Sequence, residues 1–189
     1  MVGRDLEPKK RQASATGPAR LVLENITVGR KGQKPELSNI SLTIHQGEIF
    51  GIAGVAGNSQ NPLMEVIAGV RTPASGRITL DGDEISGLSA GTIKDMGLGH
   101  IPDDRFVEGL VPELSIEENL ILGDHRGYFA RGGMLDFPKM RVTAEQMIKE
   151  FQISAPSAET PAGNLSGGNA QRVILAREKR LATRVLLAN

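Results

Sequence analysis

A serine and two glycines at 166–168 stand directly before a long helical pattern, and this junction constrains the fold more than any other part of the sequence. Apolar residues from Val173 to Leu181 follow with helical spacing, and the apolar run at 185–188 predicts a buried strand. Serine hydroxyl and glycine N–H groups at a helix start form an anion site, because those N–H groups have no partner within the helix and lie at its positive end. The alternative is an ordinary serine-capped helix start.

A second glycine-rich turn lies at 54–61, between an apolar run and a helical pattern. The run at 47–54 is almost continuously apolar and predicts a buried parallel strand. A helix is predicted at about 60–69, and Pro62 supports its start because proline there needs no N–H partner and pre-sets φ. Strand, glycine turn and helix together predict a phosphate-binding loop; a plain tight turn is the alternative.

The turn departs from the usual phosphate-loop pattern GxxxxGK[ST] at three keyed positions. Gly54 matches the first glycine, whereas Ser59 replaces the second, Gln60 the lysine and Asn61 the hydroxyl residue. Gln60 can hydrogen-bond a phosphate but carries no charge, and Asn61 offers an amide oxygen where a hydroxyl normally reaches Mg²⁺. Binding of ATP and Mg²⁺ at this loop is therefore expected to be weak or absent, and hydrolysis is expected to be impaired.

Strand and helix patterns divide the rest of the chain. Alternating apolar residues at 21–28 and 37–44, separated by a turn, predict an antiparallel strand pair. Two further strands are expected at 77–82 and 98–101, and two helices at 116–122 and 142–151. An α/β protein with a mostly helical insertion at about 104–160 follows from this order.

Composition excludes several classes of protein. The chain has 22 basic and 22 acidic residues, so no net field attracts it to nucleic acid. It has no cysteine, which excludes disulfides and thiolate metal sites, and it has three scattered histidines. No run approaches the roughly 20 apolar residues of a spanning helix, so membrane association is expected only through a partner.

Three motifs together resemble those of ABC ATPases. LSGGNAQ at 165–171 is similar to the LSGGQ signature, and GVAGNSQ at 54–60 and IPDDR at 101–105 lie in the expected order before it. The loops look most like those of the second ATP-binding half of nucleoside and simple-sugar importers, which typically read GVAGNGQ, IPEDR and LSGGNQQ. The resemblance covers residues 21–189.

The departures from that pattern are Ser59 for glycine, Asp103 for glutamate and Ala170 for glutamine. Ser59 adds a Cβ where the backbone approaches phosphate, so it weakens the expected affinity. In many ABC ATPases a glutamine in the place of Asp103 senses the γ-phosphate and its metal. A carboxylate there could ligate the metal or repel the phosphate, and a solvated turn residue is the alternative.

The resemblance implies a P-loop NTPase core of ABC ATPase type, with an N-terminal antiparallel β subdomain and a helical signature subdomain. Residues 1–20 are expected to form a linker, and 21–189 a nucleotide-binding domain truncated at the Walker B strand. Asn189 stands where an aspartate normally holds magnesium. The residue that positions the attacking water would come next, so the fragment alone is expected to be catalytically inactive.

The resemblance also implies which residues contact nucleotide, and it implies no catalytic or metal-ligating residue in this chain. The residues expected to contact nucleotide lie in the chain's own loop, in the IPDDR motif and in the signature. They are Gly54, Gly57, Asn58, Ser59, Gln60, Asn61, Asp103, Ser166, Gly167, Gly168 and Asn169.

In a head-to-tail pair of such domains, each site joins one half's phosphate loop to the other half's signature. A weak loop and a nearly complete signature therefore belong to different sites. The implied partners are another ABC nucleotide-binding half, expected in the same polypeptide, membrane permease subunits and an extracytoplasmic solute-binding protein. The implied location is peripheral, on the cytoplasmic face of the plasma membrane. The alternatives are a soluble non-transport ABC ATPase and an interaction module without nucleotide binding.

Overall fold

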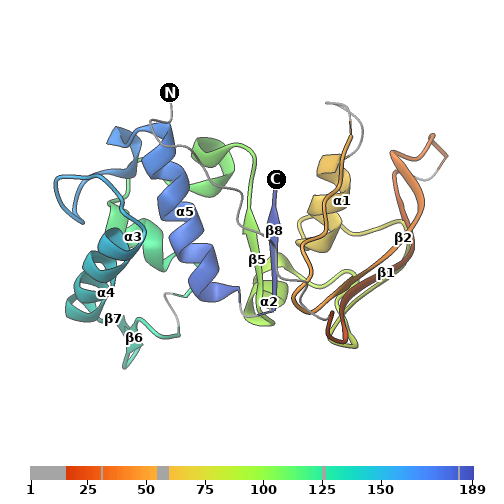
Figure 1. The fold of residues 1–189 in the computed structure, drawn as a ribbon, viewed down its shortest axis with the longest axis horizontal. Coiled ribbons are helices and arrows are strands. Elements are labelled where there is room, and N and C mark those ends of the chain that lie inside the picture. Colours follow the sequence, from red (N-terminus) through yellow and green to blue (C-terminus); the bar gives the residue numbers. More distant parts are fainter. Residues whose placement is uncertain (1–15, 31, 55–59, 125–126, 183) are drawn as a thin grey trace.

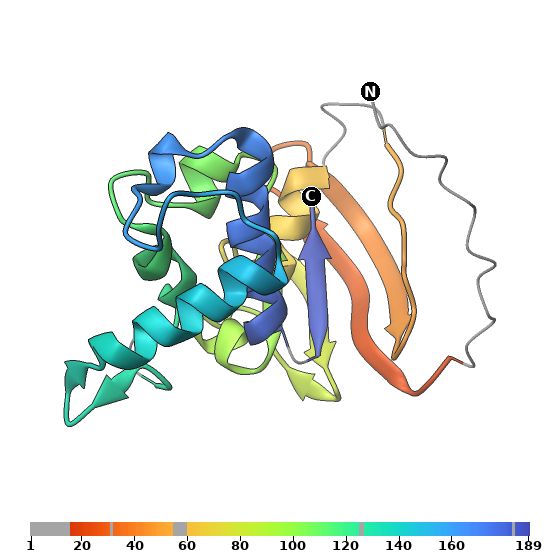
Figure 2. The same ribbon diagram turned by 60° about the vertical axis from the view of Figure 1, so that its left-hand side comes forward.

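The computed structural model describes residues 16–30, 32–54, 60–124, 127–182 and 184–189. An antiparallel sheet with one helix forms one half of the molecule, and helices dominate the other (Figure 1). A pair of parallel strands lies between the two halves, as Figure 2 also shows. Most of the predicted linker and the centre of the predicted phosphate loop, 55–59, lie outside the described residues.

The antiparallel sheet has the strand order β2-β1-β3-β4. Its strands are β1 (Ala19–Val28), β2 (Leu37–His45), β3 (Ser75–Leu80) and β4 (Asp83–Glu84). β1 pairs with β2 on one side and β3 on the other, which confirms the predicted antiparallel pair. Inward-facing residues such as Leu21 and Ile78 are completely buried, because the period of two places alternate side chains on one face.

Helix α1 (Gln60–Ile67) covers this sheet and confirms the helix predicted after the glycine turn. Leu63, Val66 and Ile67 are its buried residues, and they belong to the same apolar core as the sheet residues. Three apolar residues at spacings of three and one occupy one helix face, so α1 is fixed by packing along that face.

The parallel strands are β5 (Leu98–Ile101) and β8 (Val185–Ala188), in the register Leu98 to Val185. Both were predicted. Helix α2 (Ala90–Asp95) precedes β5, with Ser89 as its N-cap.

The prediction of a buried parallel strand at 47–54 is wrong. The segment has no strand structure, and Ile49 is 79% exposed while Phe50 and Ile52 are also exposed. A segment forms a parallel strand only where a neighbouring strand offers unpaired N–H and C=O groups for hydrogen bonding. β8 pairs with β5, and no described residue of 47–54 pairs with either strand.

The helical half confirms the predicted mostly helical insertion. Its elements are η1 (Arg105–Gly109), α3 (Ile116–Ile121), β6 (Ala130–Arg131), β7 (Met134–Leu135), α4 (Phe137–Glu150), η2 (Ala162–Asn164) and α5 (Gly167–Leu181). The small β6–β7 hairpin was not predicted, because two-residue strands have no readable alternation. Within the described part of the chain, no helix is both long enough and apolar enough to cross a membrane.

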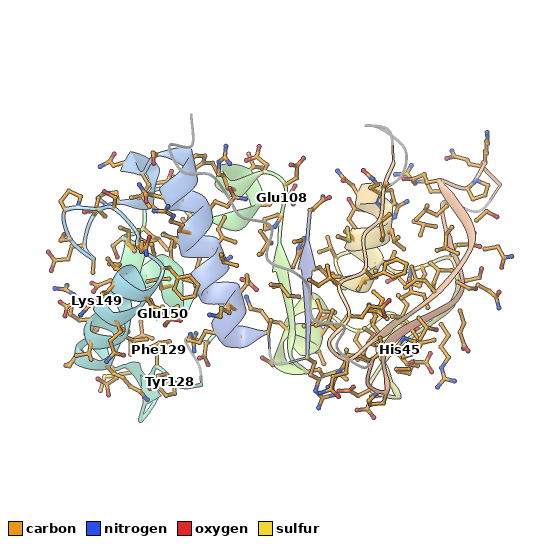
Figure 3. All side chains as sticks on the ribbon, viewed as in Figure 1. His45, Glu108, Tyr128, Phe129, Lys149 and Glu150 are labelled. Carbon is orange, nitrogen blue, oxygen red and sulfur yellow. The ribbon has the colours of Figure 1, made fainter. Side chains whose placement is uncertain are left out.

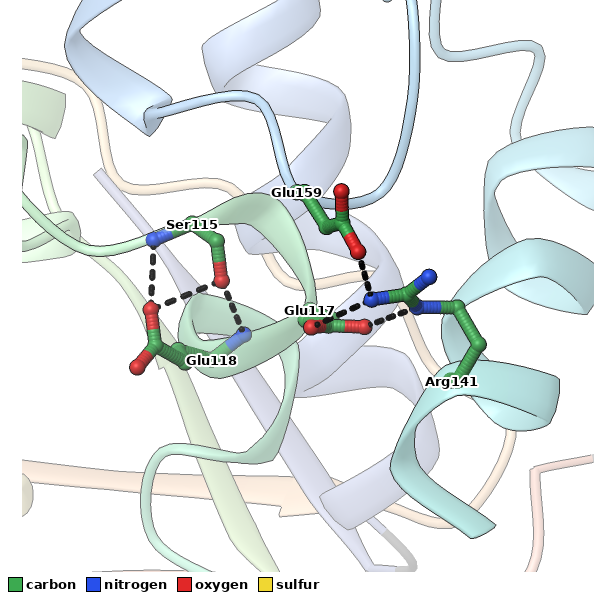
Figure 4. A network of polar contacts seen from close by, with 5 residues as sticks. All are labelled: Ser115, Glu117, Glu118, Arg141 and Glu159. Carbon is green, nitrogen blue, oxygen red and sulfur yellow. Dashed lines mark hydrogen bonds and ion pairs between the residues drawn. The ribbon is translucent and has the colours of Figure 1, made fainter. Parts of the chain in front are cut away.

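Polar contacts fix α3 against α4 (Figure 4). Ser115 and Glu118 form a capping box, in which the Ser115 hydroxyl accepts from Glu118 N and the Glu118 carboxylate accepts from Ser115 N at 2.8 Å. Arg141 of α4 contacts Glu117 of α3, with Nε 2.5 Å from Oε2, and Glu159 of the following loop. One guanidinium therefore joins three segments of the helical half.

Asn119 is the polar centre of this half and has no exposed surface. Its Oδ1 accepts from Val111 N at 2.9 Å, and its Nδ2 donates to the carbonyl oxygens of Val111, Leu114 and Ser115. The buried side chain thus pairs four backbone groups of the loop that leads into α3 and has hydrogen bonds at both ends of its own amide.

Replacing Asn119 with alanine should destabilise the chain by about 2–4 kcal/mol, because it leaves buried backbone groups unpaired. Urea unfolding measures this loss. Asn164→Ala is the matched control, since Asn164 is exposed and should change stability by about 0.5 kcal/mol or less. A cost for Asn119→Ala equal to that of the control would contradict this role.

Candidate nucleotide-binding site

The predicted phosphate loop leads into α1, whose first residue is Gln60. The Gln60 side chain folds back on the turn: a methyl carbon placed on Gly54 would lie 2.8 Å from Gln60 Nε2. A side chain at 54 would therefore displace the Gln60 amide from this position. Gly57, Asn58 and Ser59 lie outside the described residues. The described part of the loop offers amide groups and no cation to a phosphate.

The residues at the expected magnesium positions come together. Asn189 Nδ2 donates to Asn61 Oδ1 at 3.2 Å, although the two residues are 128 positions apart. Mg²⁺ prefers carboxylate, hydroxyl and water oxygens, and here two neutral amides satisfy one another. Among the described residues, no group of three acidic, histidine or cysteine side chains could hold a metal ion. The pair does not fit a tightly bound magnesium ion.

Asp103 lines the same cavity as this amide pair. The cavity has a volume of about 550 Å³ and lies between α1, α2, β5 and α5. Asp103 lies two residues after the end of strand β5 and is exposed, so the strand brings it to the end of the sheet where Asn189 follows β8. The structure thus gathers Asn61, Asp103 and Asn189 around one space.

The signature residues lie at the start of α5. Ser166 is the N-cap with φ −63° and ψ 153°, but its hydroxyl makes no capping hydrogen bond. Instead, Ser166 Oγ accepts from Asn169 Nδ2 at 3.0 Å, and Asn169 Oδ1 accepts from Ser154 N at 2.9 Å. The serine-capped alternative is therefore not what forms. Asn169 uses both ends of its amide to hold Ser166 in place, and the first N–H groups of α5 stay free of a side-chain cap.

The two glycines of the signature have different neighbours. A methyl carbon on Gly167 would lie 3.2 Å from the guanidinium carbon of Arg105, whereas one on Gly168 would meet nothing within 4 Å. A side chain at 167 would therefore need a small shift of the Arg105 guanidinium. Gly168 faces open space, so nothing in the chain itself explains why it is a glycine.

Arg105 is a residue that sequence reasoning missed as a part of the site. It begins η1, two positions after Asp103, and its guanidinium rests on the start of α5. A cation at the positive end of a helix is unfavourable unless an anion is near. The signal that could have found it was the IPDDR motif, whose last residue is this arginine.

Tyr128 and Phe129 are two neighbouring aromatic residues with different surroundings. Both lie in the helical half, at its lower edge in Figure 3. Phe129 is fully buried against Ile121 and Met140, so it belongs to the core. Tyr128 is 56% exposed, with Lys139 Nζ 3.4 Å above its ring, and is available for contact.

Comparison with solved structures defines the class. A dimeric ATP-binding cassette in a post-hydrolysis state, bound to ADP and phosphate, is 25% identical with a TM-score of 0.73 and matches 89% of this chain and 72% of its own. A nucleotide-free cassette from an ABC transporter is 22% identical with a TM-score of 0.69 and matches 90% of this chain and 68% of its own. The fold is that of an ABC ATPase cassette.

The family profile described as ABC transporter matches residues 37–188, and the chain belongs to this family. The glucose import ATP-binding protein TsgD13 of Haloferax volcanii is 38% identical over all of this chain and 35% of its own length. The guanosine import ATP-binding protein NupO of Bacillus subtilis is 38% identical over 94% of this chain and 35% of its own length. The ribose import ATP-binding protein RbsA of Chromobacterium violaceum is 33% identical over 99% and 36%. The chain spans about a third of the length of these curated relatives.

Gly168→Ala should leave the fold intact and raise its stability by about 0.5 kcal/mol, because alanine costs less backbone entropy in a helix and its methyl group meets nothing. Denaturant unfolding of the chain measures this effect. Gly167→Ala is the comparison, since Arg105 must shift to accept it, and should be less stable than Gly168→Ala. The opposite order would show that Gly168 is a structural glycine.

Proposed function

We propose that this chain is an ATP-binding half of an importer for nucleosides or simple sugars, and that it supplies its signature to the nucleotide site of a partner half. Its own phosphate loop binds ATP weakly in this proposal. The observation that supports this proposal is the contrast between the phosphate loop and the signature. The amides of Gln60 and Asn189 stand where charged groups are expected and that of Asn61 where a hydroxyl is expected, while the signature keeps its serine and both glycines.

The weak half of the proposal rests on electrostatics. Phosphoryl transfer depends on cations that stabilise charge on the transferring phosphate, and Gln60 supplies none. Asn61 and Asn189 hydrogen-bond each other at 3.2 Å and carry no negative charge toward Mg²⁺. Asp103, which lines the same cavity, is the carboxylate that we expect to serve the metal. When bound, ATP with Mg²⁺ would supply the phosphoryl group whose transfer drives the transporter.

The competent half of the proposal rests on the start of α5. Asn169 holds Ser166, Gly168 has open space before it, and the helix N–H groups point outward from an uncapped end. A terminal phosphate presented by another subunit would meet a hydroxyl, backbone N–H groups and the positive end of a 15-residue helix. Gly54, Gly57, Asn58, Ser59 and Gln60 would in turn face the partner half's signature.

The solute class and the remaining partners come from the relatives. Their names state import of glucose, guanosine and ribose, which is the basis for a nucleoside or simple-sugar importer here. Such a transporter also contains permease subunits, a solute-binding protein and a second nucleotide-binding half, in the same polypeptide or another. The chain would work at the cytoplasmic face of the membrane, bound through those permeases. We expect no nucleic-acid partner for this chain.

Substitutions in the signature should damage the assembled transporter more than substitutions in the weak loop. Ser166→Arg or Gly168→Asp places bulk or negative charge where phosphate must approach, and should lower steady-state ATPase activity by about a hundredfold or more. Gln60→Ala removes one neutral hydrogen bond, about 1 kcal/mol, and should lower it tenfold or less. Equal losses from Gln60→Ala and Gly168→Asp would refute the division between the two sites.

Gln60→Lys should tighten ATP binding to this chain by about tenfold, because it adds a charged hydrogen bond to phosphate. It should hardly change turnover, since Asn189 still supplies no carboxylate to the metal. Calorimetric titration with ATP measures the affinity. Gln146→Lys on the exposed face of α4 is the matched control for added charge. Equal tightening by both variants would mean that residue 60 does not contact the phosphates.

A further inference from the structure

A cluster of charged side chains is buried where helix α5 meets the sheet half of the molecule. Glu178, near the end of α5, is the centre: its side chain is 3% exposed. Its carboxylate accepts from Arg177 Nε at 2.7 Å, from Lys94 Nζ of α2 at 3.3 Å and from the backbone N of His100 in β5 at 3.2 Å. Arg177 Nη1 also donates to the carbonyl of Asn119, the buried asparagine of α3.

The charges of this cluster compensate one another. Burial alone would raise the pKa of Glu178, but Arg177, Lys94 and the donated hydrogen bonds outweigh it, so its pKa lies below the usual value and the group is ionised. Burial lowers the pKa of Lys94, and the attraction of Glu178 opposes this shift. Burial likewise lowers the pKa of His100, which faces Glu178, Glu108 and Lys94. Such a cluster is costly to disturb, because removing one member leaves the others charged and unpaired.

The cluster joins elements of both halves. Lys94 belongs to α2 and His100 to β5 of the parallel pair between the halves, whereas Arg177 and Glu178 belong to the helix that begins with the signature. The contact is close, since a methyl carbon on Gly99 would lie 2.7 Å from the Cβ of Ala182, just after α5. β5 ends at Ile101, two residues before Asp103, so one carboxylate holds both the strand that leads to Asp103 and the helix that starts at the signature.

We propose that Glu178 is a positioning residue, which fixes the direction of α5 relative to β5 and thereby places the signature for the partner's nucleotide. Ser166 lies 12 residues before Glu178, about 18 Å along the helix at 1.5 Å per residue. A tilt of about 5° at Glu178 therefore moves the signature by about 1.5 Å. Displacements of about 1 Å at a reacting centre can cost a hundredfold in rate.

The positional part of this inference is independent of the proposed function, and its consequence for ATPase activity rests on that function. Two measurements separate them. The first is the distance between spin labels at Glu24 of β1 and Gln171 of α5, both exposed, in the full-length polypeptide. This sequence has no cysteine, so two introduced cysteines are its only thiols. The second is the steady-state ATPase activity of the assembled transporter.

Glu178→Gln keeps the side-chain shape and removes its charge. It should shift or broaden the label distance distribution and lower ATPase activity by about tenfold or more, with ATP affinity at this chain's own loop unchanged within twofold. Lys94→Gln leaves the contacts of Glu178 to Arg177 and to the backbone N of His100, so it should have a smaller effect in the same direction. Lys94→Arg keeps the charge and should preserve most of the activity.

Lys179→Gln is the matched control, because Lys179 follows Glu178 in the same helix and pairs with Glu150 at the surface. It should change neither measurement. An unchanged distance distribution in both Glu178→Gln and Lys94→Gln would overturn the positioning role. A shifted distribution with normal ATPase activity would support the positioning role and contradict the proposed use of the signature.

Discussion

The position of helix α5 is the constraint on which the rest of the site depends. Its first turn carries the signature, its middle buries Val173 and Ile174 in the core of the helical half, and its last turns hold the buried ion cluster. A 15-residue helix transmits orientation because its backbone hydrogen bonds make it stiff over this length. Glu178 and the glycines at 167–168 therefore lie on one stiff helix, so the orientation set at Glu178 is transmitted to the glycines.

The two ends of the candidate site differ in chemistry for a physical reason. A phosphate loop needs charge as well as backbone N–H groups, because triphosphate and magnesium bring several charges of both signs. A signature needs only a helix start, a hydroxyl and room, since the partner half holds the nucleotide. In the proposed function, the neutral amides at Gln60, Asn61 and Asn189 therefore weaken the phosphate loop and leave the signature unaffected.

Sequence reasoning found the elements whose signal is local. The glycine turn before α1, the signature before α5 and the antiparallel pair β1–β2 were predicted because spacing and turn residues determine them. The apolar run at 47–54 led to a wrong strand prediction. An apolar run shows that a segment can be buried, but it does not show whether a neighbouring strand pairs with it. Glu178 beside Lys94 could not be predicted, because charged residues on a helical pattern are expected in solvent until tertiary packing places them. The position of Arg105 beside Gly167 was signalled only by the IPDDR motif.

The central claim is that this chain completes another half's nucleotide site while its own loop holds ATP weakly. The most direct measurement is photolabelling of the assembled transporter with 8-azido-ATP at limiting concentration, followed by mapping of the label to each nucleotide-binding half. Labelling concentrated on the partner half, with little on this chain, is the predicted result. Equal labelling of both halves across the titration would contradict it.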